Sequence, residues 1–352
     1  YNLAILNQEL GRHAEAEKLF RQALAIDSRF LPAHQSLICL LDQIPRKGLW
    51  LSQNARTDWV ITCLNQKAVI EHANIPDENR QLKVGYVSAD FRGHSIAYFV
   101  NPLFRRLATH GIKVHCYSNE RRVDEVTRAI MEGVPVWRNI WDLDDRQFVE
   151  LIVTDQIDVL IDLSGHTVGN RLSAFACQPA PIQATYLGYL ATTGMREMQY
   201  RISDWSLDPE TGSIDGQTEF IARTSGCCVA FSADESAPPV SELPANANGY
   251  ITFVSLNARQ KINEDVLKLW REILKSIPDA RLAMVFQYGE SPISATPIRD
   301  FFASGGVESH RVTVMGRQTL QGFFRILQKS DIAIDPFPYS GGTTTFHCLW
   351  MG

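Results

Sequence analysis

The sequence has no uninterrupted stretch of 18 apolar residues and no visible signal peptide. A helix needs about 20 mainly apolar residues to cross a bilayer, so we expect no membrane span and no membrane partner. None of the seven cysteines forms a Cys-x-x-Cys pair or a zinc-type spacing, and the adjacent Cys227 and Cys228 suit neither a simple disulfide nor a metal site. These absences favour reduced thiols in a cytoplasmic protein.

An excess of positive charge is also missing. The chain carries 34 Lys and Arg against 39 Asp and Glu, a net charge of −5, with a hydrophobic fraction of 45%. Nucleic-acid binders usually present a basic face, so we expect no nucleic-acid partner. The 352 residues exceed one ordinary domain and predict two or three. Both ends fall inside patterned segments, so we expect the chain to be cut from a longer protein.

Residues 1–45 predict helices, followed by a helical connector over residues 46–81. Small and aromatic residues recur where a helix-turn-helix repeat packs its helices together, at Ala4, Gly11, Ala16, Phe20 and Ala23. This spacing resembles a tetratricopeptide repeat, although Ser28 stands where that repeat usually has proline. A segment this short does not hold enough repeats to form a stable solenoid alone. We therefore expect it to continue an upstream array of repeats or to pack on the next domain. An unrelated helical hairpin is the alternative.

Short apolar strands then alternate with helical segments in two series. The first series has strands near residues 83–89, 113–118, 158–163 and 181–187, and the second near 251–255, 281–286, 311–315 and 331–335. This alternation predicts α/β lobes with parallel sheets covered by helices on both faces. We assign residues 82–235 and 250–352 to the two lobes, and the proline-rich residues 236–249 to a linker. Ligands of two doubly wound lobes bind at strand ends that face a shared cleft.

The turn Gly341–Thr345 precedes a predicted helix. Glycines let the backbone approach an anion, and the free amides and positive dipole at a helix start favour a phosphate. Taken alone, the turn is explained equally well as an ordinary helix cap.

Four further loops follow predicted strands. Lys261 lies in the segment 257–262, where a lysine can neutralise a leaving diphosphate, although most lysines are solvated surface residues. His94 lies in the loop 88–95, although a lone loop histidine is more often structural, and Asp90 is explained by capping a turn. The segments 163–171 and 178–194 complete the set, and the small-residue loop after the predicted strand 181–187 leaves room for a sugar against backbone. All five loops are expected at the same edge of their sheets.

Several strings in order resemble one family. They are Val84–Phe91 with His94, Pro179–Gln183, Leu187–Tyr189, Lys261, and Gly341–Trp350. Residues 83–352 resemble the catalytic region of the protein O-linked N-acetylglucosamine transferases and their SPINDLY-like relatives, glycosyltransferase family 41. The resemblance implies two Rossmann-like lobes of the GT-B type. It also implies an inverting, metal-independent transfer from a nucleotide sugar to Ser or Thr hydroxyls of proteins, with no other cofactor.

The resemblance also implies roles for single residues. Lys261 would stabilise the diphosphate, and His94 would lie beside the reacting groups as a candidate base. The implied donor-binding set is Leu187, Gly188, Asn257, Gln318, Phe323, Gly342, Thr343, Thr344 and His347. Within it, Leu187 and Gly188 would line the sugar, Thr343 and Thr344 would bind phosphate oxygens, and the Gln318 backbone would meet the base.

Some positions depart from the family pattern. Phe323 stands where a histidine commonly stacks on uracil, and His347 stands in the place of an acidic residue that holds the ribose. Leu320, Ala258 and Leu190 also differ. The favoured donor is UDP-N-acetylglucosamine (UDP-GlcNAc), and GDP-fucose is the alternative, supported by the SPINDLY-like string Leu163–Thr167.

Three other readings of the sequence are weaker. A non-catalytic repeat scaffold is possible, but the presence of both His94 and Lys261 argues against it. A transferase for small molecules leaves the repeat-like helices unexplained. The string Asp142–Asp144 resembles a metal-binding DxD motif, but it lies at a predicted helix start, where carboxylates cap.

Overall fold

The computed structural model describes residues 1–44, 48–64, 70–77, 79–210 and 216–352, so parts of the predicted connector, at 46–47, 65–69 and 78, lie outside it. The chain divides into two compact units. The N-lobe unit comprises Arg21–Cys39 and Trp50–Ser232, and the C-lobe unit comprises Tyr1–Phe20, Leu40–Leu49 and Ala233–Gly352.

The N-terminal segment is helical, as predicted. Its helices are α1 (Asn2–Glu9), α2 (His13–Ile26), α3 (Leu31–Leu41) and α4 (Gly48–Cys63). Ala4, Ala16 and Phe20 are fully buried, which agrees with the packing positions read from the repeat-like pattern. The predicted helical connector is correct only for α4, because the described residues between 70 and 82 form neither helix nor strand. Polar residues and a proline there offer no apolar stripe that a helix could bury.

The N-lobe unit is built on a parallel sheet. In the part of the chain that the structure describes, seven strands pair in the order β3-β2-β1-β4-β5-β6-β7, each parallel to its neighbour. Its elements are β1 (Lys83–Ser88), α5 (Ala97–Ala108), β2 (Lys113–Ser118), α6 (Glu125–Glu132), β3 (Val136–Asn139), α7 (Asp145–Asp155), β4 (Val159–Asp162), α8 (Leu172–Phe175), β5 (Ile182–Thr185), β6 (Tyr200–Asp204) and β7 (Phe220–Thr224).

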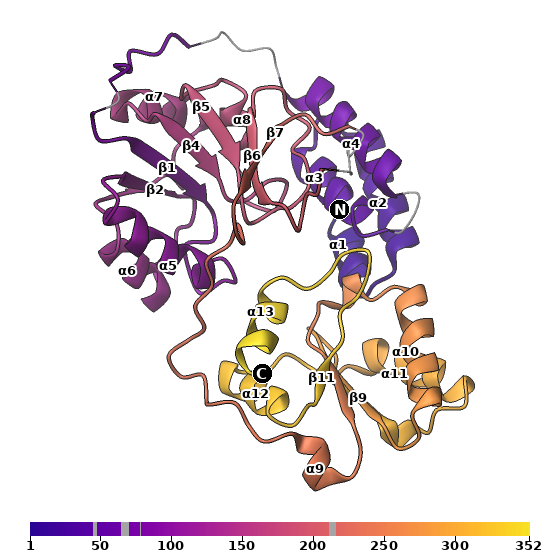
Figure 1. The fold of residues 1–352 in the computed structure, drawn as a ribbon. Helices are drawn as coiled ribbons and strands as arrows, with labels where there is room; N and C mark the ends of the chain where they lie inside the picture. The colour runs from indigo at the N-terminus through magenta and orange to yellow at the C-terminus, as the bar shows by residue number, and fades with distance from the viewer. Residues whose placement is uncertain (45–47, 65–69, 78, 211–215) are drawn as a thin grey trace. The chain divides into compact units, whose positions relative to one another are not determined.

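Helices cover both faces of this sheet. Successive strand side chains point to opposite faces. Accordingly, Cys116 of β2 packs in a core cluster with residues of α5 and α6, whereas the next residue, Tyr117, meets Phe148 of α7 with ring centroids 5.7 Å apart. Figure 1 shows α5 and α6 on one side of the sheet and α7 and α8 on the other. The doubly wound prediction is therefore confirmed for this unit.

Three strands of this sheet were not predicted. β3, β6 and β7 have only four or five residues and mix apolar with charged side chains. β7 lies between the predicted strands at 181–187 and 251–255, where the sequence predicts none, so that expectation is wrong there. These strands form because their backbones complete the hydrogen-bonded ladder on a neighbouring strand, and local composition carries no signal of that.

The C-lobe unit contains the second parallel sheet, with the strand order β10-β9-β8-β11. Its elements are α9 (Pro244–Asn248), β8 (Thr252–Ser255), η1 (Arg259–Lys261), α10 (Glu264–Ser276), β9 (Arg281–Val285), α11 (Pro292–Ser304), η2 (Ser309–Arg311), β10 (Val312–Met315), α12 (Leu320–Leu327), β11 (Ile332–Ala333) and α13 (Thr343–Trp350).

Two core clusters lie on the two faces of this second sheet. Phe253 of β8 packs with α10 and α11, and the next residue, Val254, packs with α12. β11 has two residues, fewer than the predicted 331–335, and the chain then runs into Asp335-Pro336. The short helix α9 lies within the predicted linker. Both predicted lobes therefore contain a doubly wound parallel sheet.

Candidate active site

The strand order of the C-lobe unit creates a switch point between β8 and β11. Connections from β8 proceed toward β9 and β10, while β11 lies on its other side. In such sheets, ligands bind outside the carboxyl ends of the strands at this point. The loop after β8 carries Lys261, and the loop after β11 leads to Gly341 and α13. Both predicted donor loops of this unit therefore flank the switch point.

Side chains tie these two loops together. The Lys261 ammonium donates to the carbonyl oxygen of Ser340 at 2.9 Å and lies 4.7 Å from the centre of the Tyr339 ring. The Asn263 amide donates to the carbonyl oxygen of Phe337 at 2.6 Å. Burial lowers the pKa of Lys261, and the negative charge of Asp335 opposes this shift. The lysine predicted to meet a diphosphate is thus hydrogen-bonded to the residue that directly precedes the turn predicted to grip it.

Asp335 organises the same region. Its carboxylate accepts a hydrogen bond from the Asn257 amide at 3.0 Å and another from the Thr345 hydroxyl at 2.9 Å. The Thr344 hydroxyl in turn donates to the Asn257 side-chain oxygen at 3.4 Å. Asn257 and Thr344, both in the predicted donor set, are thus brought together. Asp335 was missed as a site residue, although its position just before the turn was a usable signal.

The two glycines of the turn have different surroundings. A β-carbon on Gly341 would lie 2.4 Å from the Thr345 hydroxyl and 2.8 Å from both Asp335 and Thr344. A β-carbon on Gly342 would meet nothing within 4 Å. Gly341 therefore lets three polar side chains converge, while Gly342 leaves open space beside the first turn of α13. Unpaired amides and the positive helix dipole make such an end suitable for an anion.

The residues predicted to meet the nucleotide lie on α12, on α13 and in the turn before α12. The rings of Phe323 and His347 pack edge to face with centroids 5.4 Å apart, and His347 is 4% exposed. Burial lowers the pKa of His347, and Asp234 opposes the shift. The Gln318 amide donates to the carbonyl oxygen of Gly316 at 2.8 Å, which shapes the turn before α12. Contact of these residues with a nucleotide stays a prediction.

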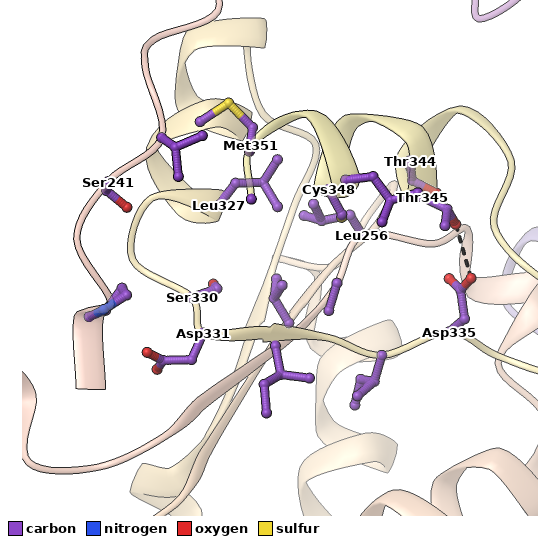
Figure 2. Close-up of a pocket in the computed structure, with 18 of the residues that line it drawn as sticks. Ser241, Leu256, Leu327, Ser330, Asp331, Asp335, Thr344, Thr345, Cys348 and Met351 are labelled. Carbon is purple, nitrogen blue, oxygen red and sulfur yellow. Dashed lines mark hydrogen bonds between the residues drawn. The ribbon is translucent and has the colours of Figure 1, made fainter. Parts of the chain in front are cut away.

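A pocket of about 470 Å³ also lies in this unit, against β11 and α13. Figure 2 shows the hydrogen bond between Asp335 and Thr345 at one end and Asp331 at the other. Apolar side chains such as Leu256 and Leu327 line much of its wall. Of the predicted donor residues, only Asn257 and Thr344 reach it. The pocket therefore borders the predicted donor residues without containing most of them.

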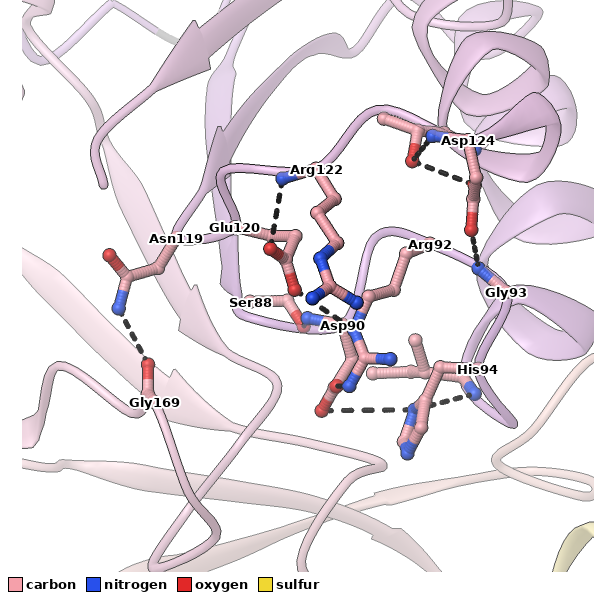
Figure 3. A network of polar contacts seen from close by, with 12 residues as sticks. Ser88, Asp90, Arg92, Gly93, His94, Asn119, Glu120, Arg122, Asp124 and Gly169 are labelled. Carbon is pink, nitrogen blue, oxygen red and sulfur yellow. Dashed lines mark hydrogen bonds and ion pairs between the residues drawn. The ribbon is translucent and has the colours of Figure 1, made fainter. Parts of the chain in front are cut away.

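His94 belongs to a polar network at the carboxyl ends of β1 and β2 (Figure 3). Its Nδ1 atom lies 3.7 Å from the Asp90 carboxylate, which also accepts a hydrogen bond from Arg92 at 3.0 Å. Arg92 pairs with Glu120 at 3.2 Å. Desolvation lowers the pKa of His94, Asp90 raises it and Arg92 lowers it further. The imidazole is therefore neutral near pH 7, with 42% of the side chain exposed, and can accept a proton.

Leu187 and Gly188 follow β5 at the same edge. Leu187 has a left-handed backbone conformation, with φ of 71°. A β-carbon on Gly188 would lie 1.9 Å from the carbonyl oxygen of Leu163, so the loop rests directly on the end of β4. The Tyr189 side chain packs on Gly165, where a β-carbon would lie 2.3 Å from the Tyr189 Cβ atom and 2.5 Å from its ring. The loops after β4 and β5 are therefore held together by close contacts that only glycine permits.

Buried polar groups beneath these loops were missed by sequence reasoning. Asp162 accepts hydrogen bonds from the Ser164 and Gly165 amides and the Thr185 hydroxyl, and burial raises its pKa to about 6. His166, in the same loop, bonds the carbonyl oxygen of Thr193 at 2.8 Å, and burial lowers its pKa to about 3. These groups hold the loops in place. Their positions at a strand end give no sign of burial.

Three further expectations concern a helix cap, metal ligands and a membrane span. Asp144 is the N-cap of α7, and its side chain accepts a hydrogen bond from the Gln147 amide, so the predicted cap is confirmed. Among the described residues, no three His, Cys, Asp or Glu side chains form a group that could hold a metal ion. Within the same residues, every helix is too short or too polar to cross a membrane.

Two doubly wound parallel sheets with these loops define a glycosyltransferase of the GT-B class, and comparison with known proteins supports this. A lysine-to-methionine mutant of the Thermobaculum terrenum O-GlcNAc transferase superposes with a TM-score of 0.94 and 30% identity, over all of this chain and 67% of that one. The model of "Glycosyl transferase family 41" matches residues 27–222. The chain belongs to glycosyltransferase family 41.

Two curated plant proteins show how similar the relatives are. The chain is 34% identical over 292 residues to an Arabidopsis thaliana protein named "Probable UDP-N-acetylglucosamine--peptide N-acetylglucosaminyltransferase SPINDLY", covering 79% of this chain and 31% of that protein. It is 24% identical over 284 residues to the Arabidopsis protein with the same enzyme name and the suffix SEC, covering 78% and 28%. The chain therefore spans about 30% of the length of these relatives.

Proposed function

We propose that this chain is the catalytic region of an enzyme that transfers N-acetylglucosamine from UDP-GlcNAc to Ser or Thr hydroxyls of proteins. The transfer inverts the anomeric centre and uses no metal. Residues 82–235 and 250–352 would form its two lobes, joined by residues 236–249, and the N-terminal helices would present the protein acceptor. The free state of all seven cysteines supports a cytoplasmic location. The names of the relatives support the donor and the acceptor class.

One observation carries the proposal. The Lys261 ammonium lies 2.9 Å from the carbonyl oxygen of Ser340, the residue directly before the turn that opens α13. A fixed cation and the positive end of a helix therefore converge on one point, beside the open space at Gly342. When the bond between sugar and diphosphate breaks, negative charge grows on the leaving group. Positive groups held in place beforehand stabilise that charge without reorganising.

The remaining predicted residues take complementary roles in this proposal. Thr343 and Thr344 bind phosphate oxygens with their amides and hydroxyls. Leu187 and Gly188 line the sugar with a loop that close contacts hold rigid. His94 accepts the proton of the acceptor hydroxyl, which its lowered pKa favours because the ring is then neutral.

GDP-fucose is the alternative donor. The string Leu163–Thr167 favours it, and the paired aromatic rings of Phe323 and His347 replace groups that suit uridine. Either donor uses the same grip on the diphosphate. The alternative therefore changes the base and the sugar but not the role of Lys261.

Binding and turnover of UDP-GlcNAc and GDP-fucose, measured side by side, test the proposal. We expect UDP-GlcNAc to bind and turn over, and Lys261→Ala to lower kcat/KM about 100-fold. Lys275→Ala is the matched control, because Lys275 pairs with Glu272 on the exposed face of α10, and this variant is expected to keep full activity.

The outcomes separate the parts of the proposal. If neither nucleotide sugar binds, the proposal that this chain is a glycosyltransferase is refuted. If only GDP-fucose turns over, the donor is GDP-fucose and not UDP-GlcNAc. If Lys261→Ala keeps full activity, the assignment of Lys261 to the diphosphate site is wrong.

A further inference from the structure

The N-terminal helices touch the loop that carries Lys261. In the C-lobe unit, the Nε2–H of His13 at the start of α2 donates to the carbonyl oxygen of Gln260 at 2.7 Å. The two residues are 247 positions apart in the sequence, and Gln260 directly precedes Lys261. The backbone of the proposed diphosphate lysine is therefore held by a side chain from the repeat-like segment.

A second contact reinforces the first. Gly11, in the turn between α1 and α2, has φ of 70°, and a β-carbon there would lie 2.6 Å from Nη1 and 2.9 Å from Cζ of Arg259. The same guanidinium donates to the carbonyl oxygen of Ile262. Burial lowers the pKa of Arg259 to about 10, so it keeps its charge near pH 7. The guanidinium thus fills the space between the α1–α2 turn and η1.

The loop between these anchors has little stability of its own. η1 is a single 3-10 turn, closed by hydrogen bonds from the Lys261 and Ile262 amides to the carbonyl oxygens of Ala258 and Arg259. Such short turns have poor hydrogen-bond geometry and depend on their surroundings. The position of the Lys261 ammonium at Ser340 therefore depends on what holds the loop from the other side, which is His13 and the turn at Gly11.

From these contacts, the geometry points to His13 as a positioning residue for Lys261, so that the helical segment completes the donor diphosphate site of the C-lobe unit. This inference rests on the proposed function, because it assumes that Lys261 meets the diphosphate. It assigns the helices α1 and α2 a part in donor binding, in addition to the presentation of an acceptor. Loss of the His13 hydrogen bond lets the loop move and costs affinity for the diphosphate.

Calorimetric titration of the purified protein with UDP tests this role. A typical hydrogen bond between neutral groups corresponds to a change in Kd of roughly threefold to tenfold. We expect His13→Phe and His13→Asn to raise the Kd for UDP by about that factor, because phenylalanine lacks the donor and asparagine is too short to reach. His13→Gln places an amide N–H near the Nε2 position and should restore binding.

His34→Phe is the matched control. The Nε2 atom of His34 bonds the carbonyl oxygen of Ser28 at 2.9 Å, so this variant removes a similar hydrogen bond within the N-lobe unit. We expect it to lower the melting temperature without changing the Kd for UDP. In the Lys261→Ala background, His13→Phe should cause no further loss of UDP affinity, because it acts through Lys261.

Each result decides between the two proposals. If Lys261→Ala weakens UDP binding but His13→Phe and His13→Asn bind as the wild type does, the positioning role is wrong and the proposed function stands. Equal losses in His13→Phe and His34→Phe, or additive losses with Lys261→Ala, also overturn the positioning role. Wild-type binding by Lys261→Ala refutes the diphosphate assignment itself.

Discussion

Replacing Gly188 by alanine would place a β-carbon 1.9 Å from the carbonyl oxygen of Leu163. An ordinary contact is at least 3.4 Å, so the two backbones must separate by about 1.5 Å (3.4 − 1.9). Neither side yields easily, because Leu163 closes β4 through a backbone hydrogen bond to Val87 at 3.0 Å. A misplacement of about 1 Å at a substrate-positioning group can cost about 100-fold in rate. We therefore expect Gly188→Ala to lower kcat/KM for UDP-GlcNAc about 100-fold.

The assay compares initial rates of sugar transfer and melting temperatures of two alanine variants. Gly226→Ala is the matched control, because a β-carbon there meets nothing within 4 Å and its φ is not left-handed. It should keep wild-type activity. The reasoning is refuted if Gly188→Ala folds and transfers sugar at the wild-type rate, since the loop would then not touch the donor or would move without consequence.

Three further predictions concern catalysis, helix capping and acid stability. His94→Asn should lower kcat about 100-fold or more while leaving the Kd for UDP unchanged, and an unchanged kcat in rate assays would exclude His94 as the base. Asp144→Ala should lower the free energy of unfolding in urea by about 1 kcal/mol, because α7 loses its N-cap, and no loss would contradict the cap. Burial raises the pKa of Asp158, but Arg80 and other donors outweigh it and bring the pKa from 3.8 to about 2. This carboxylate therefore stabilises the fold above about pH 4 and loses that contribution as the pH falls toward 2, by roughly 1 to 2 kcal/mol. The free energy of unfolding of Asp158→Asn, measured between pH 2 and pH 5, should therefore change less with pH than that of the wild type.

The strands and helices of the two lobes were largely predictable where local patterns are strong. The strands at residues 83–88 and 113–118 are short segments centred on Val and Tyr, and α10 has a clear apolar stripe, so each was found within a residue or two. β6 and β7 were missed, because mixed short segments become strands only when a neighbouring strand supplies hydrogen-bonding partners.

The sequence by itself determined the family, the two parallel α/β lobes and the loops that carry Lys261, His94 and the glycine-threonine turn. These follow from local periodicity and from motifs that are short in sequence. Only the tertiary structure decided that Asp335 joins Asn257 to Thr345, and that His13 holds the Lys261 loop from 247 positions away. Those contacts depend on how segments that are far apart in the sequence pack against one another, and the local pattern of residues does not predict that packing.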